Sequence, residues 1–239
     1  MKGTHYLIEY RFQGSSKYEI RKMINHLEKK FRLPGGKKVP HITLAGGFTT
    51  DNERKLVKDF VLVCSKTPLC KFTVDGFGYF DNKTGGVVFI NINPNENLKT
   101  FRWDLAQTLS NYCILKEYDY KQDFEFHATL AMKLETRDFS KIKKYIDEYP
   151  EPQYKQVLIR ATLLKNGRIM YEYDFLQKRL LTRSEALSKR ELTKTFQLLK
   201  DYFKGSYNPN AVLSPVEIIE EMSWLSKIPI IGKLFFGGK

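Results

Sequence analysis

Short apolar runs and helically spaced apolar residues alternate along the first 180 residues. Aromatic and β-branched runs predict strands at residues 4–12, 41–48, 70–80, 87–92, 124–134, 154–164 and 169–176. Spacing of three and four predicts helices beginning at Ser15 or Ser16, at Asp51, and over residues 97–113 and 139–149. The order strand, helix, strand therefore occurs twice, which indicates an internal duplication.

The pattern changes after Leu181, where one amphipathic helix is predicted over residues 184–203 and another from Ser214. We therefore expect a domain over residues 1–181, with halves of about 1–84 and 85–181, and a C-terminal helical extension over residues 182–239. The chain ends in the apolar, basic segment IPIIGKLFF, which is too short to span a bilayer. This tail has three possible roles: docking onto its own domain, contact with a partner or second copy, and adsorption to a membrane surface. The sequence decides neither among these roles nor the oligomeric state.

The charge is more informative than the general composition. The chain has 239 residues, is 42% hydrophobic, and carries a net charge of +13. Residues 183–239 contribute 9 basic and 6 acidic residues, so +10 of this charge precedes them. A positive field favours phosphate-rich partners. The chain shows no signal peptide and no apolar run of eighteen residues, so we expect a cytoplasmic protein. Its three cysteines lack a CxxC spacing and are expected to be buried thiols.

Two of the four histidines stand in the same local sequence. Residues 40–44 read PHITL and residues 126–130 read FHATL. This coincidence would arise by chance in about one such chain in several thousand. Each phrase falls on the second predicted strand of its half, whereas His5 and His26 lack this context and are expected at the surface or in packing roles.

The repeated phrase has a definite chemical use. Alternate residues of a strand face the same side, so His41 lies beside Thr43 and His127 beside Thr129, about 7 Å apart along each strand. One imidazole can accept a proton from water while the other donates one to a leaving alkoxide, which is what phosphodiester cleavage requires. The threonine hydroxyls can bond the non-bridging phosphate oxygens. No HExxH or carboxylate-rich motif indicates a metal, and we expect no cofactor.

PHITLAGGF and FEFHATLAMKL, on a duplicated α+β chain, resemble the two-histidine (2H) phosphoesterase superfamily, in particular its 2′-5′ RNA ligase and RNA 2′,3′-cyclic phosphodiesterase branch. The resemblance covers about residues 1–181. It implies an α+β, bilobal fold with two antiparallel sheets lining a central cleft and helices outside. It also implies His41 and His127 as acid and base, and Thr43 and Thr129 as phosphate contacts.

One position departs from the family pattern. Many members place arginine five residues after the second histidine, where this chain has Met132. By strand alternation the next residue, Lys133, shares a face with His127 and Thr129, so Lys133 is a candidate phosphate contact. Lys37 and Lys38, just before the first motif, are candidates for steering a polynucleotide, or form a solvated loop.

These features predict a metal-independent phosphoesterase acting on RNA or nucleotides, most simply by hydrolysing a 2′,3′-cyclic phosphate to a 2′-phosphate. The alternatives are a 2′-5′ phosphodiesterase or ligase, a cyclic-nucleotide phosphodiesterase, and a non-catalytic RNA-binding module. The sequence does not decide which histidine is the base. For ring opening we favour His127 as the base and His41 as the acid.

Overall fold

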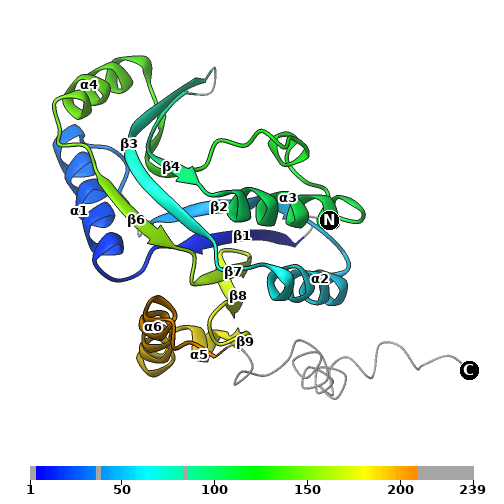
Figure 1. The fold of residues 1–239 in the computed structure, drawn as a ribbon. Helices are drawn as coiled ribbons and strands as arrows, with labels where there is room; N and C mark the ends of the chain where they lie inside the picture. The colour runs from blue at the N-terminus through cyan, green and yellow to red at the C-terminus, as the bar shows by residue number, and fades with distance from the viewer. Residues whose placement is uncertain (1–3, 36–38, 83–84, 209–239) are drawn as a thin grey trace, which may run out of the picture.

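A computed structural model describes residues 4–35, 39–82 and 85–208, which form two antiparallel sheets and six α-helices (Figure 1). The predicted helix from Ser214, the tail, and the lysines at 37 and 38 lie outside the described residues. None of the helices within those ranges is long and apolar enough to cross a membrane.

The first sheet has the strand order β2-β1-β7-β8-β9 and the second the order β5-β4-β3-β6, so the prediction of an α+β fold with two antiparallel sheets is confirmed. The strands of the first sheet are β1 His5–Arg11, β2 His41–Thr49, β7 Arg160–Lys165, β8 Arg168–Asp174 and β9 Arg179–Thr182. Those of the second are β3 Lys71–Asn82, β4 Gly85–Pro94, β5 His127–Leu134 and β6 Gln153–Val157.

The first four helices are α1 Gly14–Phe31, α2 Glu53–Lys66, α3 Glu96–Ser110 and α4 Thr136–Asp147. Among these four helices, α1 and α3 each contact a strand of the sheet that does not contain the strand before them. Helix α1 follows a strand of the first sheet but contacts β5 and α4, while α3 follows a strand of the second sheet but contacts β2 and α2. In Figure 1, α1 and α4 accordingly lie on one side of the molecule and α2 and α3 on the other. One continuous apolar core joins the two halves.

Most predicted elements are present, with changes at their ends. The N-terminal residue of α1 is capped neither by Ser15 nor by Ser16, because the helix begins at Gly14, and Gln13 at the cap position makes no side-chain cap bond. The short 3₁₀ helix η1 (Glu117–Tyr120) and strand β9 were not predicted, because both are too short to show a periodic pattern.

The predicted single strand over residues 154–164 is wrong in one respect. It is two strands, β6 and β7, which belong to different sheets. The chain crosses between the sheets at Leu158 and Ile159, both of which are buried. Because the chain passes from one sheet to the other inside the core, the residues there are apolar. The sequence therefore contains no glycine, proline or polar residue that would mark a break between two strands.

The predicted helix over residues 184–203 is also divided, into α5 (Arg183–Ala186) and α6 (Lys189–Lys204). Leu187 interrupts it and is 61% exposed, and the Ser188 hydroxyl accepts a hydrogen bond from the Glu191 N–H at the start of α6. Ser188 therefore acts as a helix cap in the middle of a pattern that reads as continuous.

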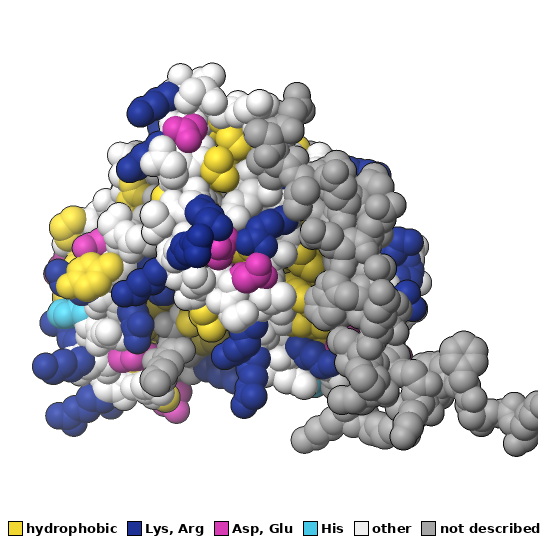
Figure 2. All heavy atoms as spheres, turned by 90° about the horizontal axis from the view of Figure 1, so that it is seen from below, with side chains coloured by type: hydrophobic (Ala, Val, Ile, Leu, Met, Phe, Trp, Pro, Cys, Tyr) yellow, Lys and Arg dark blue, Asp and Glu magenta, His cyan; other side chains and the backbone are white. Residues whose placement is uncertain are grey.

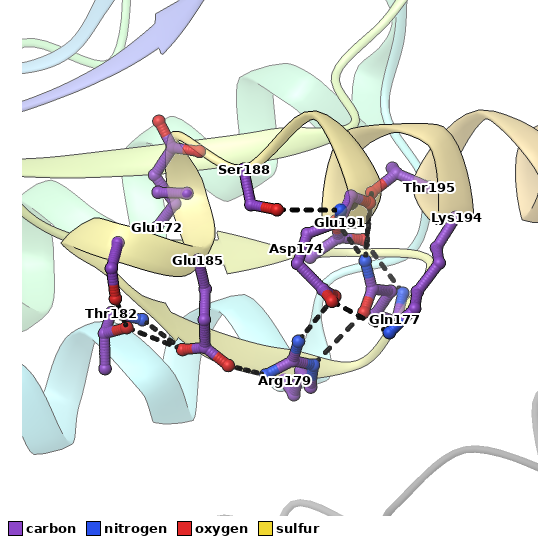
Figure 3. A network of polar contacts seen from close by, with 12 residues as sticks. Glu172, Asp174, Gln177, Arg179, Thr182, Glu185, Ser188, Glu191, Lys194 and Thr195 are labelled. Carbon is purple, nitrogen blue, oxygen red and sulfur yellow. Dashed lines mark hydrogen bonds and ion pairs between the residues drawn. The ribbon is translucent and has the colours of Figure 1, made fainter.

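A buried polar network attaches α6 to the first sheet (Figure 3). The Arg160 guanidinium donates to Asp174 through Nε at 2.8 Å and to the Thr195 hydroxyl at 2.8 Å. Thr195 in turn donates to Asp174 at 2.5 Å. Thr195 is the one residue of α6 that is buried, so this helix is held by polar contacts. The division into residues 1–181 and 182–239 remains a prediction.

Candidate active site

The two predicted motif strands lie next to each other. β2 and β5 are the outer strands of their sheets, and they contact each other across the two halves. His41 and His127 are the first residues of these strands. The two rings are near enough that a charge on His41 affects the titration of His127. Residues 86 positions apart are thus brought into one site.

The two motif strands have the same irregular pairing. In β2, His41 lies opposite Arg11 and Thr43 opposite Glu9, and the register shifts directly after this pair. A second shift follows before Phe48 pairs with Tyr6.

In β5, the same offsets recur. His127 lies opposite Asn91, Thr129 lies opposite Phe89, and the register shifts directly after Thr129 and again before Leu134. Each motif is therefore followed by bulges at matching positions, which gives the two halves a common local geometry. Glu9 and Phe89 occupy equivalent positions in the two halves, next to Thr43 and Thr129.

Both imidazoles are oriented by the same hydrogen bond. Nδ1 of His41 lies 2.8 Å from the Val39 carbonyl oxygen, and Nδ1 of His127 lies 2.8 Å from the Glu125 carbonyl oxygen. A carbonyl oxygen only accepts, so each Nδ1 carries the proton. Nε2 of each ring is then the atom left to accept or donate a proton in chemistry.

His127 stands in an apolar environment. Its ring centroid lies 5.1 Å from that of Phe80 and 5.0 Å from that of Phe89. Burial lowers the pKa of His127, because the charged imidazolium is poorly solvated there; the Glu125 carbonyl opposes this shift and His41 adds to it. The neutral form, which accepts a proton at Nε2, is favoured.

His41 stands beside a carboxylate. Its Nε2 lies 3.7 Å from Oε2 of Glu9, which is buried in the adjacent strand. The other oxygen of Glu9 accepts a hydrogen bond from Nε of Arg11 at 2.5 Å. The separation to His41 is too long for a hydrogen bond, but the carboxylate attracts a positive charge on the ring. The equivalent positions thus carry a carboxylate beside one histidine and a phenyl ring beside the other.

The two threonines are available for a ligand. Thr43 and Thr129 are partly exposed and share a strand face with His41 and His127, two residues away in each case. Within the described residues neither hydroxyl makes a hydrogen bond. The site therefore combines two imidazole Nε2 atoms with two free hydroxyl groups, which is the set required for acid–base chemistry on a phosphodiester.

The structure does not support the strand-alternation argument that placed Lys133 on the same face as His127 and Thr129. Because the register of β5 shifts after Thr129 and again before Leu134, alternation from His127 does not extend to residue 133. Lys133 takes a left-handed conformation with φ of 59°, and both it and Met132 are exposed. A role for Lys133 in phosphate binding stays a prediction without this support.

A buried ion pair fixes the segment that leads into β5. Arg102 of α3 bonds Asp119 at 2.9 Å, and both side chains are almost completely buried. Asp119 also accepts the backbone N–H of Gly46 in β2 at 3.1 Å. The Tyr118 ring and hydroxyl occupy the space next to Gly46, so a side chain at position 46 would displace Tyr118. These contacts attach the segment that precedes His127 to β2, the strand that carries His41.

Sequence reasoning found the histidines and threonines but missed their surroundings. Phe80, Phe89 and Glu9 were all read as ordinary strand residues. The signal for Glu9 was present, since it is the one acidic residue of the strand HYLIEYR and stands directly between Ile8 and Tyr10. No comparable signal marks the phenylalanines, because phenylalanine is common in any sheet.

Comparison with known proteins identifies the family of this chain. The model of the 2′-5′ RNA ligase superfamily matches residues 16–166. The chain therefore belongs to this superfamily of two-histidine phosphoesterases, as the motifs indicated. No curated protein sequence matches the chain.

Similar solved structures include Escherichia coli LigT complexed with 3′-AMP, with 18% identity over 71% of this chain and 93% of that chain, and a TM-score of 0.44. Another is Kluyveromyces marxianus Usb1 with uridine monophosphate, with 12% identity over 76% of this chain and 99% of that chain, and a TM-score of 0.43.

Proposed function

We propose that this protein is a metal-independent phosphodiesterase that opens 2′,3′-cyclic phosphates at RNA or nucleotide ends and leaves a 2′-phosphate. The observation that carries the proposal is the pair of histidines with equal Nδ1 hydrogen bonds and unequal surroundings. A hydrolysis of this kind needs one proton acceptor and one proton donor at the same phosphate.

The assignment of roles follows from the surroundings. Nε2 of neutral His127 takes a proton from water as the water oxygen attacks phosphorus. The bond from phosphorus to the ribose 3′-oxygen breaks, and Nε2–H of His41 protonates that oxygen. The products are a 2′-phosphate and a 3′-hydroxyl, with the proton now on His127 and absent from His41. Exchange of protons with solvent restores both rings.

The threonine hydroxyls and the Glu9 carboxylate support the same step. Charge builds on the non-bridging phosphate oxygens in the transition state, where the Thr43 and Thr129 hydroxyls donate hydrogen bonds. Oε2 of the Glu9 carboxylate lies 3.7 Å from Nε2 of His41, where its negative charge attracts a positive charge on that ring. Each histidine is expected to contribute about 10²- to 10⁴-fold to the rate.

The test is to incubate the protein with a short RNA ending in a 2′,3′-cyclic phosphate, in excess EDTA, and to identify the product. We expect a 2′-phosphate from the wild type, and formation of this product about 10²- to 10⁴-fold slower with His41→Ala or His127→Ala. His26→Ala is the control. His26 is exposed on α1 and its ring bonds the Tyr145 hydroxyl of α4, so this variant is expected to be fully active.

The result also separates the alternatives. Activity that EDTA abolishes would contradict the metal-independent mechanism. If the wild type leaves this RNA unchanged, 2′-5′-linked and cyclic nucleotides are the next substrates. Failure on those with intact RNA binding would favour a non-catalytic RNA-binding module.

A further inference from the structure

A cavity of about 720 Å³ opens between the second sheet and helix α6. One wall is formed by β3, β4 and β6, and the other by the side chains of Phe196, Leu199 and Phe203. The face of the molecule on the α5 and α6 side carries many Lys and Arg side chains with apolar side chains between them (Figure 2). The volume lies in the range of pockets that hold ligands of nucleotide size.

The cavity continues the strand face that carries His127. Asn91 lies opposite His127, and Asn93, two residues further along β4, shares that face. Asn93 lies opposite Thr73, which lies opposite Lys155. Asn93, Thr73 and Lys155 all line the cavity. Strand spacing places Asn93, at the cavity wall, about 7 Å along β4 from Asn91, the residue opposite His127. This spacing is about one nucleotide step.

The wall from α6 has the character of a ligand-binding surface. The buried side of this helix is polar, at Thr195, while its apolar residues are left partly uncovered. Phe203 is 61% exposed. The ammonium group of Lys71 lies 5.9 Å from the centre of the Phe203 ring. An aromatic face beside a cation is the arrangement that holds bases and phosphates of single-stranded nucleic acids.

The polar lining favours an anion. It includes Lys71 and Lys155 and contains neither aspartate nor glutamate, although the chain has 27 acidic residues. The Tyr10 side chain is 1% exposed, lines the cavity, and its hydroxyl makes no hydrogen bond within the described residues. A hydroxyl can donate and accept hydrogen bonds, so this group at the cavity wall is available to a polar ligand.

We propose that this cavity binds the RNA strand on the 5′ side of the reacting phosphate. Lys71 and Lys155 contact backbone phosphates, and Phe203 stacks on a base. The inference rests on the proposed function and narrows its substrate class to polynucleotides, since a mononucleotide would leave the cavity empty. Helix α6 lies beyond the residues matched by the family model, so this wall is an addition to the family's common part.

The test compares two substrates that share one reacting group: a 2′,3′-cyclic mononucleotide and a hexanucleotide with the same 3′ end. For Lys71→Ala/Lys155→Ala we expect kcat/KM to fall at least tenfold on the hexanucleotide and to stay within twofold on the mononucleotide. Phe203→Ala should lower kcat/KM on the hexanucleotide at least fivefold, without loss on the mononucleotide. Lys22→Ala/Lys58→Ala, on exposed positions of α1 and α2, removes the same charge away from the cavity and should match the wild type.

Salt dependence gives a second readout. The slope of log Kd against log salt concentration for the RNA should become shallower by about 1.4 in the double lysine variant, which corresponds to about 0.7 for each lost phosphate contact. Binding is measured by fluorescence anisotropy with a labelled hexanucleotide ending in a 3′-hydroxyl, so it does not depend on turnover.

Equal losses on both substrates, or an unchanged kcat/KM on the hexanucleotide, would overturn the inference. If the wild type turns over neither substrate, the proposed function fails, and the anisotropy measurement still decides the cavity. In that case an unchanged Kd in the double lysine variant, or no RNA binding by the wild type, would overturn it.

Discussion

At the scale of residues, the two histidines share a backbone hydrogen bond and differ in what surrounds their rings. The Nδ1 bonds to the Val39 and Glu125 carbonyls orient both rings alike. The distinction between acid and base therefore comes from neighbouring strands, where Glu9 and Phe89 stand at equivalent positions. The motifs themselves hold no such information, which is why the sequence located the pair without separating the roles.

The apolar surroundings of His127 predict where kcat/KM falls on the acid side of its pH profile. Burial lowers the pKa of His127, so its neutral form persists to lower pH than that of a solvated histidine. Activity is lost as the pH falls through that pKa, because the protonated ring accepts no proton. Phe80→Ala admits water to the ring, raises the pKa, and should move the acid limb of kcat/KM to higher pH. A profile unchanged in position, measured with a correctly folded variant, would show that Phe80 does not set this titration.

At the scale of elements, the strands and helices with long, regular patterns were predicted well, and the motif strands were among them. The Asn166-Gly167 turn between β7 and β8 has φ of 49° and 75°, the positive values that a two-residue Asn-Gly hairpin turn requires. The failures share a physical cause. At Leu158–Ile159 and at Leu187–Ser188 the chain changes direction on residues that also fit a continuous strand or helix, so tertiary packing decides.

The buried contacts of α6 predict a stability difference between two threonines of that helix. Thr195 is buried and bonds Asp174, Arg160 and Gln177, whereas Thr193 is exposed and bonds the Lys189 carbonyl. Thr195→Val leaves buried polar groups without a partner and should lower the free energy of unfolding by about 1 to 3 kcal/mol. Thr193→Val should change it by less than about 0.5 kcal/mol.

Urea unfolding followed by circular dichroism measures both variants, with the wild type as reference. An equal effect of the two substitutions would show that the network does not hold α6 to the first sheet.

At the scale of the whole molecule, the duplication is what builds the site. Each half supplies one histidine and one threonine on an outer strand, and the contact of β2 with β5 unites them. The sequence predicted the duplication and the four motif residues, because these depend on local pattern. It did not reveal the cavity beside α6, because that depends on how a later helix lies against the other sheet.

In the proposed mechanism His41 and His127 act on one transition state, so the effects of removing them should not be additive. We expect His41→Ala/His127→Ala to lose no more in kcat than the more impaired single variant, within about fivefold. Single-turnover rates of the three variants measure this. Losses that multiply would mean that the two histidines act in separate steps.

The central claim, that His127 is the base and His41 the acid, is tested most directly by a leaving group that needs no proton. A cyclic-phosphate RNA whose 3′-oxygen is replaced by sulfur releases a thiolate, because thiols have a pKa of about 8.5. On this substrate His41→Ala should recover to within about tenfold of the wild type, while His127→Ala remains reduced by about 10²-fold or more. Recovery of His127→Ala instead, or of neither variant, would contradict the assignment.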